Sequence, residues 1–448
     1  MNDATTDQKS KGPAAVEKPN AATSGAPGAP DRPVQARSFG GAVKDLLATE
    51  GVASLFAIAV VAVVFQLQTS LFLSSENISN LLVQCAPLAM VALAQCAVIL
   101  MKEIDLSLGS MVGVTAAIGA TLITNNGETW WVAVILMLAV GAAFGALQGG
   151  IIVVGKVPAF VVTLGGYLAF LGIQLNTLGA AGGINVSSDP IQKLTTDKLS
   201  HGLGLLIAVL VLLAWIANRA MRIRSAHRTG AAQARPLGLE VVIAAILAIV
   251  LVGGTLILNR SGGIPLVFVL VVAIVGLVAA FLHLTAAGRH VYAVGGNPEA
   301  ARRAGVKVRT LRWAGFITAG VLAACGGLIY LSYDQGASTT TGGGTLLLQA
   351  IGAAVIGGVS LFGGRGSVWG AVTGAIVLGG IENGLNLTNQ AAPTKYIIEG
   401  VVVVLAVLLD SLLRQGFEVR LGSLRRTLGG TRKRRRAGAP RAAELDAR

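Results

Sequence analysis

The segment "LGLEVVIAAILAIVLVGGTLIL", Leu237–Leu258, holds a single charged residue, Glu240, in an otherwise apolar run. A transmembrane helix needs about 20 predominantly apolar residues, so this run is long enough to cross a bilayer. Comparable runs lie near 53–74, 78–101, 106–124, 129–154, 158–180, 203–219, 263–283, 310–332, 345–362, 367–388 and 396–413. The sequence therefore predicts an all-α polytopic membrane protein with about 12 transmembrane helices, in a range of about 10–12.

The composition excludes an ordinary soluble protein. Of the 448 residues, 54% are hydrophobic and 12% are charged, whereas soluble domains carry about 25% charged residues. The chain also holds 59 glycines, which suits close contact between helices in lipid. Small residues recur at every fourth position in two stretches, at Gly141, Gly145 and Gly149 and at Gly366, Gly370 and Gly374. We expect helix backbones to meet closely along both stretches.

The net charge of +14 is concentrated on alternate connections between the spans. With the N-terminus inside, the basic connections at Lys156, 220–236, 284–309 and Arg365 fall on the cytoplasmic side, together with the C-terminal end. This pattern follows the positive-inside rule, which explains the charge better than nucleic-acid binding does. We therefore predict that both termini are cytoplasmic, and that membrane lipid but no nucleic acid is a partner.

Three regions follow from this division of the chain. Residues 1–50 are rich in Ala, Pro, Gly and Ser, a composition that cannot build a core, and we predict a disordered cytoplasmic arm. Residues 51–413 form the transmembrane domain. Residues 414–448 form a basic cytoplasmic tail that could contact anionic lipid headgroups or could simply set the topology.

The sequence contains no motif that would let this chain power transport by itself. No G-x-x-x-x-G-K-[ST] phosphate-binding loop is present, and the cysteines and histidines are scattered without the spacing of a metal site or a catalytic group. We predict no catalytic residue, no metal site and no cofactor in this chain. A transporter without a motor either couples to an ion gradient or depends on the motor of another chain.

The stretch "MKEIDLSLG", Met101–Gly109, interrupts two apolar runs with three charged residues. It could be a cytoplasmic turn. It could also be a broken or re-entrant segment with its carboxylates near the bilayer midplane, which is tolerated only where the break is buried in protein or lines a cavity. Asp105 or Ser107 would cap the helix that follows.

The polar connection 284–309 contains a fully specified short helix in "GGNPEAARRAGV". The cues follow in order: Asn297 as N-cap, Pro298 at the first position, Glu299 in the first turn, Arg302 and Arg303 in the last, and Gly305 as the stop. They predict about two turns, Pro298 to Ala304. Because so short a helix is marginal in water, it needs a surface to pack against, either in this protein or in a partner.

Four ordered motifs make the chain resemble the permease subunits of ABC importers for monosaccharides, of the ribose/xylose type. They are "EIDLSLGSMVG" (Glu103–Gly113), "KVPAFVVTLGG" (Lys156–Gly166), the 288–305 connection, and "AVIGGVSLFGGRGSVWGAVTGA…IENGLNL" (Ala354–Leu387). The resemblance covers about 78–413. It is closest to the D-xylose type, because relatives of the ribose type have less sequence where this chain has an extra pair of spans, about 237–283. The chain departs from many relatives at Leu347, Leu348 and Gln349, where they carry Glu-Leu-Asp.

This resemblance implies a multi-pass protein of the bacterial cell membrane that is not itself an enzyme. Two identical permease subunits form the path, cytoplasmic ATPase subunits hold ATP and Mg²⁺, and an extracytoplasmic sugar-binding protein delivers the sugar, D-xylose above others. The connection 284–309 would be the coupling loop that docks on the ATPase. The residues assigned to it are Gly288, Arg289, Gly296, Asn297, Pro298, Glu299, Ala300, Ala301, Arg302, Arg303 and Gly305.

The candidate substrate contacts are the polar residues within or beside the spans, because such groups tend to face a cavity or a partner. They are Glu103, Asp105, Gln148, Asn176, Gln349, Glu382, Asn383 and Asn386. Each could instead hold two helices together. Two other functions stay open: a related permease for another monosaccharide, a nucleoside or a branched-chain amino acid, and an ion-coupled secondary transporter that uses Glu103, Asp105 and Glu382.

Overall fold

The computed structural model describes residues 52–229, 237–405 and 407–408. The predicted N-terminal arm (1–50), the basic tail (414–448) and part of the 220–236 connection lie outside these residues. Their predicted structure and the cytoplasmic placement of both termini therefore stay predictions.

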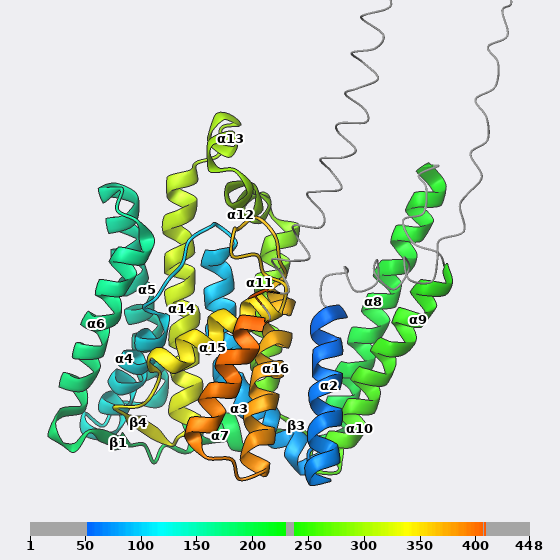
Figure 1. Ribbon diagram of the computed structural model, residues 1–448, viewed down its shortest axis with the longest axis horizontal. Helices are drawn as coiled ribbons and strands as arrows, with labels where there is room; N and C mark the ends of the chain where they lie inside the picture. The colour runs from blue at the N-terminus through cyan, green and yellow to red at the C-terminus, as the bar shows by residue number, and fades with distance from the viewer. Residues whose placement is uncertain (1–51, 230–236, 406, 409–448) are drawn as a thin grey trace, which may run out of the picture. The chain divides into compact units, whose positions relative to one another are not determined.

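The described chain is helical apart from two short antiparallel sheets (Figure 1). In chain order, the first elements are α2 (Val52–Thr69), α3 (Ser75–Ile99), α4 (Leu108–Ala120), the π-helical turn η1 (Thr121–Asn125), α5 (Trp130–Gly155), α6 (Ala159–Leu178), the 3₁₀ turn η2 (Gly179–Ala181), β1 (Gly183–Asn185), α7 (Asp189–Thr196), β2 (Lys198–Leu199) and α8 (His201–Thr229). The others are α9 (Leu237–Ala248), the π-helical turn η3 (Ile249–Gly253), α10 (Gly254–Asn259), β3 (Ile264–Pro265), α11 (Leu266–Leu284), α12 (Ala286–Gly296), α13 (Pro298–Arg303), α14 (Val308–Tyr333), β4 (Gly336–Ser338), α15 (Gly343–Ile356), α16 (Val368–Leu387) and a last helix over 392–405.

Within the described residues, 9 helices are long and apolar enough to cross a membrane. The prediction of a polytopic α-helical membrane protein is confirmed, and the apolar run Leu237–Leu258 forms the continuous helical segment α9–η3–α10. Two further apolar helices, Ser54–Thr69 and Gly343–Ile356, are shorter. The predicted last span begins in the helix 392–405 and continues into residues that are not described. The number of about 12 therefore stays a prediction.

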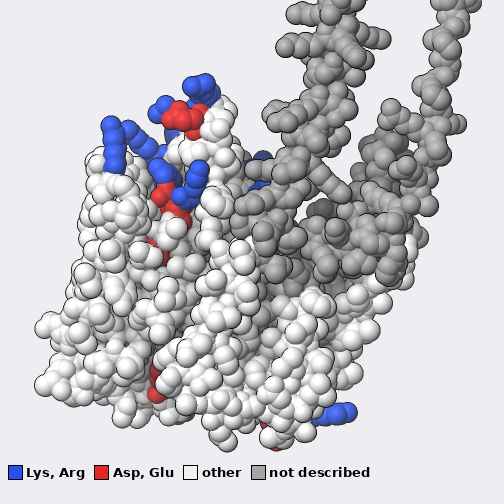
Figure 2. All heavy atoms as spheres, viewed as in Figure 1, with Lys and Arg blue, Asp and Glu red and all other residues white. Residues whose placement is uncertain are grey.

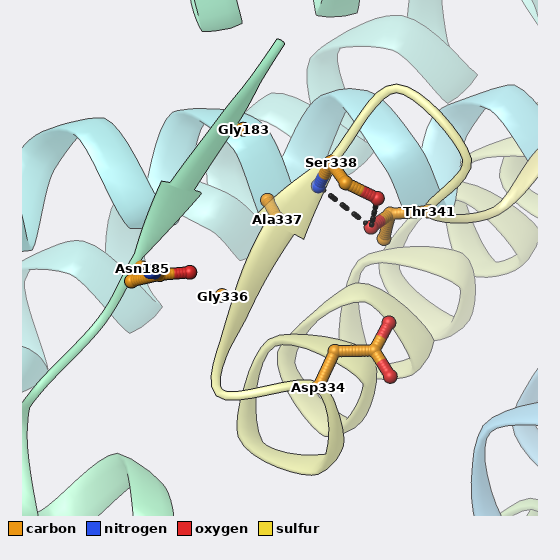
Figure 3. Close-up of a pocket in the computed structure, with 7 residues that line it drawn as sticks. All are labelled: Gly183, Asn185, Asp334, Gly336, Ala337, Ser338 and Thr341. Atoms are coloured by element: carbon orange, nitrogen blue, oxygen red, sulfur yellow. Dashed lines mark hydrogen bonds between the residues drawn. The ribbon is translucent and has the colours of Figure 1, made fainter. Parts of the chain in front are cut away.

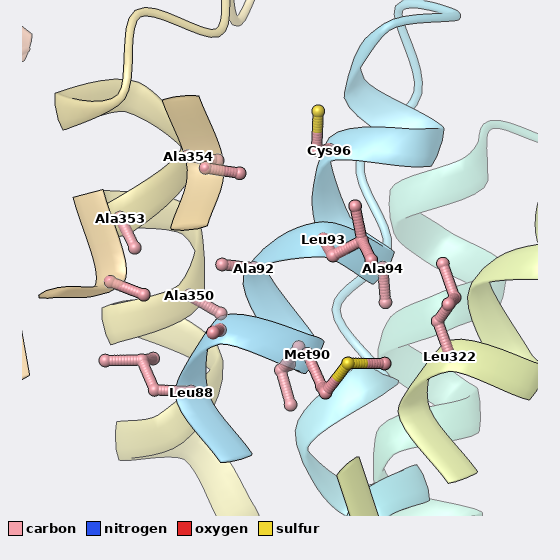
Figure 4. Packing of buried hydrophobic residues seen from close by; sticks show 14 of the residues in the cluster. Leu88, Met90, Ala92, Leu93, Ala94, Cys96, Leu322, Ala350, Ala353 and Ala354 are labelled. Carbon is pink, nitrogen blue, oxygen red and sulfur yellow. The ribbon is translucent and has the colours of Figure 1, made fainter. Parts of the chain in front are cut away.

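Helix α3 lies at the centre of the core, with α14, α15 and α16 packed around it. Leu88, Met90 and Leu93 on α3 are buried and lie between Leu322 of α14 and the alanines of α15 (Figure 4). Small residues dominate this contact, as expected where lipid provides no hydrophobic drive and helices associate through close packing.

The predicted glycine contacts are present in both stretches. A Cβ on Gly141 would lie 2.4 Å from the carbonyl oxygen of Gly320, and one on Gly320 would lie 2.1 Å from that of Gly141. In the second stretch, a Cβ on Gly370 would lie 2.0 Å from the carbonyl oxygen of Gly357. The spacing therefore brings α5 against α14, and α16 against α15, at backbone distance.

We call the end of the helices that carries α12 and α13 the α13 face, and the opposite end, with β1, β4 and α7, the β4 face (Figure 1). Strand β1 pairs with β4 in the register Gly183↔Ser338, Ile184↔Ala337 and Asn185↔Gly336, and β2 pairs with β3. The Lys and Arg side chains visible in Figure 2 gather mainly at the α13 face. That distribution agrees with the side that the charge pattern predicts to be cytoplasmic.

Candidate functional site

The short helix predicted in the 284–309 connection is present as α13. The Asn297 side chain accepts a hydrogen bond from the Ala300 backbone N–H at 3.0 Å, and Pro298 occupies the first turn. Glu299 forms an ion pair with Arg302 at 2.8 Å, and Gly305 has a φ of +86°. Helix α13 ends at Arg303, with Ala304 as its C-cap, so the predicted end is correct to one residue.

A second helix, α12, precedes α13 and was not predicted from the sequence. The side chain of Thr285 caps it by accepting a hydrogen bond from the Gly288 N–H at 3.0 Å. Gly288 lies where a Cβ would be 2.3 Å from the carbonyl oxygen of Leu282. The 284–309 connection therefore carries two helices and not the one expected, because Thr285 caps a helix before α13.

The residues assigned to ATPase coupling divide between solvent and the protein itself. Gly288 and Ala301 are buried, so they face this chain. The exposed members are Gly296, Asn297, Glu299, Ala300, Arg302, Arg303 and Gly305, with Arg289 also exposed. The exposed part of α13 is therefore acidic at its start, at Glu299, and basic at its end, at Arg302 and Arg303, with Ala300 between them.

The end of α12 brings its backbone directly against the core, where Val294 is also buried and the Tyr292 hydroxyl donates to the Gly366 carbonyl oxygen at 3.1 Å. A Cβ on Gly295 would lie 1.8 Å from the carbonyl oxygen of Leu100 and 2.4 Å from the backbone nitrogen of Gly364. The Gly364 N–H donates a hydrogen bond of 3.0 Å to that same Leu100 oxygen. Gly364 itself has a φ of +70°. We call this junction of Leu100, Gly295 and Gly364 the glycine contact.

The chain that leaves the glycine contact is the charged break between α3 and α4. Glu103 forms an ion pair with Arg312 of α14, and its side chain is 7% exposed. The Leu106 N–H then donates to the Thr163 hydroxyl of α6 at 3.1 Å. The break therefore passes from the α13 face into the protein, where its polar groups have partners.

A buried polar cluster marks the start of α4. The Ser107 hydroxyl lies 2.6 Å from Asp105 Oδ1 and 3.0 Å from Gln148 Oε1, and all three residues are buried. Ser107 is the N-cap residue, although its side chain makes no capping hydrogen bond. Gln148 lies about 10 Å along α5 from its end at the α13 face. Glu103, Asp105 and Ser107 of the break are thus buried in protein near that face, whereas Lys102 and Ile104 are exposed.

The other candidate substrate residues do not join this cluster. Asn383 lies between α16 and α3, where it accepts a hydrogen bond from Asn77 Nδ2 at 2.9 Å. Gln349 donates to Glu399 Oε2 at 2.8 Å, which ties α15 to the last helix. Lys395 donates to Asn386, Glu382 is half-buried, and Asn176 is exposed. The structure therefore distributes these residues over several helix contacts.

Sequence reasoning missed residues that act through position alone. Gly295, Leu100 and Gly364 are not among the site residues that the sequence predicts, although Gly295 lies within the predicted coupling loop. Gln174 was also missed: its Nε2 donates to the carbonyl oxygens of Ser338 at 2.9 Å and Thr341 at 3.0 Å. A polar Gln174 one turn before the end of an apolar helix is a signal that the sequence does contain. Gly295 and Gly364, in contrast, carry no local pattern that indicates which backbone they contact.

Helix α15, like α4, begins inside the protein. The chain reaches the start of α15 from the β4 face, whereas it reaches the start of α4 from the α13 face. Helix α15 has 14 residues, about 21 Å, which is less than the roughly 30 Å of a hydrocarbon core. The segment 335–342, which contains β4 and which we call the strap, leads into α15, and a Cβ on Gly342 would lie 2.3 Å from the Gly109 carbonyl oxygen. Two shortened helices of opposite direction thus meet near their N-termini, an arrangement typical of substrate sites in transporters.

Comparison with known proteins agrees with this architecture. Residues 77–407 match the family described as "Branched-chain amino acid transport system / permease component". The chain belongs to this permease family. As a permease component it is a multi-pass membrane transport protein and not an enzyme, as the sequence predicted. No solved structure matches the chain significantly.

The permease aligns with its relatives over most of its length. The xylose transport system permease protein of Haemophilus influenzae is 36% identical over 366 residues, covering 80% of this chain and 95% of that protein. The ribose import permease protein of Escherichia coli K12 is 30% identical, covering 80% and 92%. The autoinducer 2 import system permease protein of Enterobacter sp. strain 638 is also 30% identical, covering 83% and 90%.

Proposed function

We propose that this chain is the membrane-spanning subunit of an ATP-driven importer for a monosaccharide, and that D-xylose is its substrate. The observation that carries this proposal is the 36% identity to a xylose permease along nearly the whole of that relative, against 30% to a ribose permease. Uptake of labelled D-xylose, D-ribose, a nucleoside and a branched-chain amino acid by the reconstituted importer tests the substrate. Transport of either of the last two, without D-xylose, would overturn it.

The motor belongs to a partner. We propose that α12 and α13 dock on a cytoplasmic ATPase subunit, which binds ATP and Mg²⁺, with the exposed residues of α13 in contact. The capped, preformed helix supports this, because ordering it costs little at the moment of binding. The glycine contact would then transmit movement from α12 and α13 to the break before α4, because backbone packs directly against backbone there. Movement of α12 would thus reach Glu103 and Asp105.

The remaining partners follow from the same proposal. An extracytoplasmic sugar-binding protein would deliver the sugar to the β4 face, and two copies of this chain would form the path together. The exposed apolar side chains of the spans would face lipid or the second copy. Crosslinking in native membranes tests the pairing, and a monomer active at all protein densities would contradict it.

Reconstitution also separates the proposal from an ion-coupled transporter. Liposomes containing this chain alone, with an imposed proton or sodium gradient, should take up no sugar. Liposomes containing the chain with its ATPase and binding protein should take it up when ATP is supplied. Gradient-driven uptake by the chain alone would favour Glu103, Asp105 and Glu382 as ion sites.

Reversing the charge of Glu299 should uncouple the importer. Glu299 is exposed, and its carboxylate faces Arg302 on the surface proposed to dock. Placing an arginine there puts like charges side by side at an interface, so we expect Glu299→Arg to lower ATP-driven uptake about tenfold or more. Gly305→Val should act similarly, because a β-branched residue is strained at a φ of +86°.

Glu128→Arg is the matched control for this prediction. Glu128 is an exposed carboxylate in the connection before α5, on the β4 face, so its reversal should leave uptake unchanged. Immunoblots of washed membranes check that every variant is inserted in equal amount. Normal uptake by both Glu299→Arg and Gly305→Val would contradict docking through α13.

A further inference from the structure

A small open pocket lies on the β4 face, between the paired strands β1 and β4 and the end of α14 (Figure 3). Its volume is about 230 Å³, below the roughly 300 Å³ at which most drug-sized sites begin. Such a volume suits a small polar molecule. Apart from Ala337, its side chains are polar, with Asn185 from β1, Asp334 after α14, and Ser338 and Thr341 from the strap.

The lining groups match the hydroxyls of a neutral sugar. Figure 3 shows the Asn185 and Asp334 side chains around the same opening as Thr341. A carboxylate accepts hydrogen bonds, a side-chain amide both donates and accepts, and each hydroxyl does both. Thr341 Oγ1 accepts from the Ser338 N–H at 2.9 Å and shares a second hydrogen bond of 3.3 Å with the Ser338 hydroxyl. Desolvation by the surrounding protein raises the pKa of the Asp334 carboxyl above its usual range, although the residue is exposed at the opening.

The charge balance of the pocket favours a neutral ligand over a cation. Asp334 is its one carboxylate, and the other polar groups are an amide and hydroxyls. Calcium sites gather six to eight oxygen ligands, usually with several carboxylates. A single carboxylate among neutral donors and acceptors instead resembles a site that fixes the orientation of hydroxyl groups.

The pocket is built onto the strap that leads inward. Ser338 and Thr341 line the pocket with their side chains, while their carbonyl oxygens are held by Gln174 of α6. One residue further on, Gly342 packs against Gly109 of α4. A ligand that bonds to Ser338 or Thr341 therefore touches the same segment that positions the start of α15.

We propose that this pocket is the receiving site of the permease, where a monosaccharide released at the β4 face first bonds through its hydroxyls to Asp334 and Asn185. The inference rests on the proposed function and adds the residues and the place of first contact. The pocket has no aromatic side chain among its lining residues, so it holds the sugar weakly. Weak binding suits a site from which the sugar must move on.

The test measures uptake into liposomes that contain the permease with its ATPase, supplied with binding protein preloaded with D-xylose. We expect Asp334→Ala to lower uptake at saturating binding protein about tenfold, the effect of losing a hydrogen bond to a charged group. Asn185→Ala should have a smaller effect, because its bond is neutral. The concentration of binding protein that gives half-maximal uptake should not change.

Monodeoxy analogues of D-xylose, each preloaded on the binding protein, separate sugar contact from protein docking. For the analogue that lacks the hydroxyl bonded to Asp334, wild type and Asp334→Ala should transport equally. Asp189→Asn is the matched control, since Asp189 is an exposed carboxylate on the same face, paired with Lys193 at 3.0 Å. It should transport every sugar like the wild type, because exposed pairs contribute little.

Four outcomes would overturn the proposal. If Asp334→Ala takes up sugar as the wild type does, the pocket is excluded as the receiving site. The proposed function still stands in that case, because the wild type takes up sugar. An equal loss for every analogue, or a raised requirement for binding protein, makes Asp334 a docking residue for that protein. Failure of the wild type to take up any monosaccharide overturns the proposed function, and the receiving site with it.

Discussion

Replacing Gly295 with alanine should reduce ATP-driven uptake to below detection, although the added group is a single methyl. The Cβ would lie 1.8 Å from the Leu100 carbonyl oxygen, and something must shift to avoid that overlap. Neither neighbour can yield cheaply, because both Leu100 O and Gly364 N are backbone atoms joined by a 3.0 Å hydrogen bond. The expected result is separation of α12 from the core.

A glycine outside the proposed docking surface provides a control with the same chemistry. A Cβ on Gly276 of α11 meets nothing within 4 Å, so Gly276→Ala should transport like the wild type. Uptake and ATPase activity are measured together in liposomes. We expect Gly295→Ala to keep binding the ATPase subunit, since α13 is intact, while ATP hydrolysis no longer drives transport. Equal activity of the two variants would refute the glycine contact as a route of coupling.

Removing Arg312 should destabilise the permease more than removing any exposed arginine nearby. The Glu103 side chain is 7% exposed and its partner Arg312 is 35% exposed. Leaving a buried charge without its partner costs about 3–5 kcal/mol. We expect Arg312→Met to fall near the lower end of that range, seen as a reduced midpoint of thermal unfolding in detergent. Arg309→Met, at an exposed position one turn earlier, should change the midpoint little.

Glu103 and Arg312 differ in how far their side chains are exposed, and this difference gives a second comparison. Glu103→Gln leaves a partly exposed arginine that can reach solvent, so it should cost less than Arg312→Met, which strands the buried carboxylate. The double variant Glu103→Leu/Arg312→Met removes both charges and should recover most of the stability, as replacement of buried ion pairs by apolar residues often does. A double variant as unstable as Arg312→Met alone would show that the pair is not the cause.

The sequence by itself determined the features that depend on near neighbours along the chain. Hydropathy over about 20 residues placed the spans, since crossing a bilayer requires only a local run of apolar side chains. The cap of α13 could be predicted because Asn297 bonds to Ala300, three residues on. The spacing of Gly141 and Gly145 predicted close packing, although not that α14 would be the partner.

The tertiary structure alone decided which distant residues meet. Leu100, Gly295 and Gly364 come from three separate parts of the chain, and a glycine does not indicate which backbone will approach it. The same holds for the receiving pocket, where Asn185 and Asp334 are brought together by the pairing of β1 with β4. Glu103 could be recognised as an unusual charge, but its partner Arg312 could not. Local patterns fix helices and their ends, whereas contacts between them depend on the path of the whole chain.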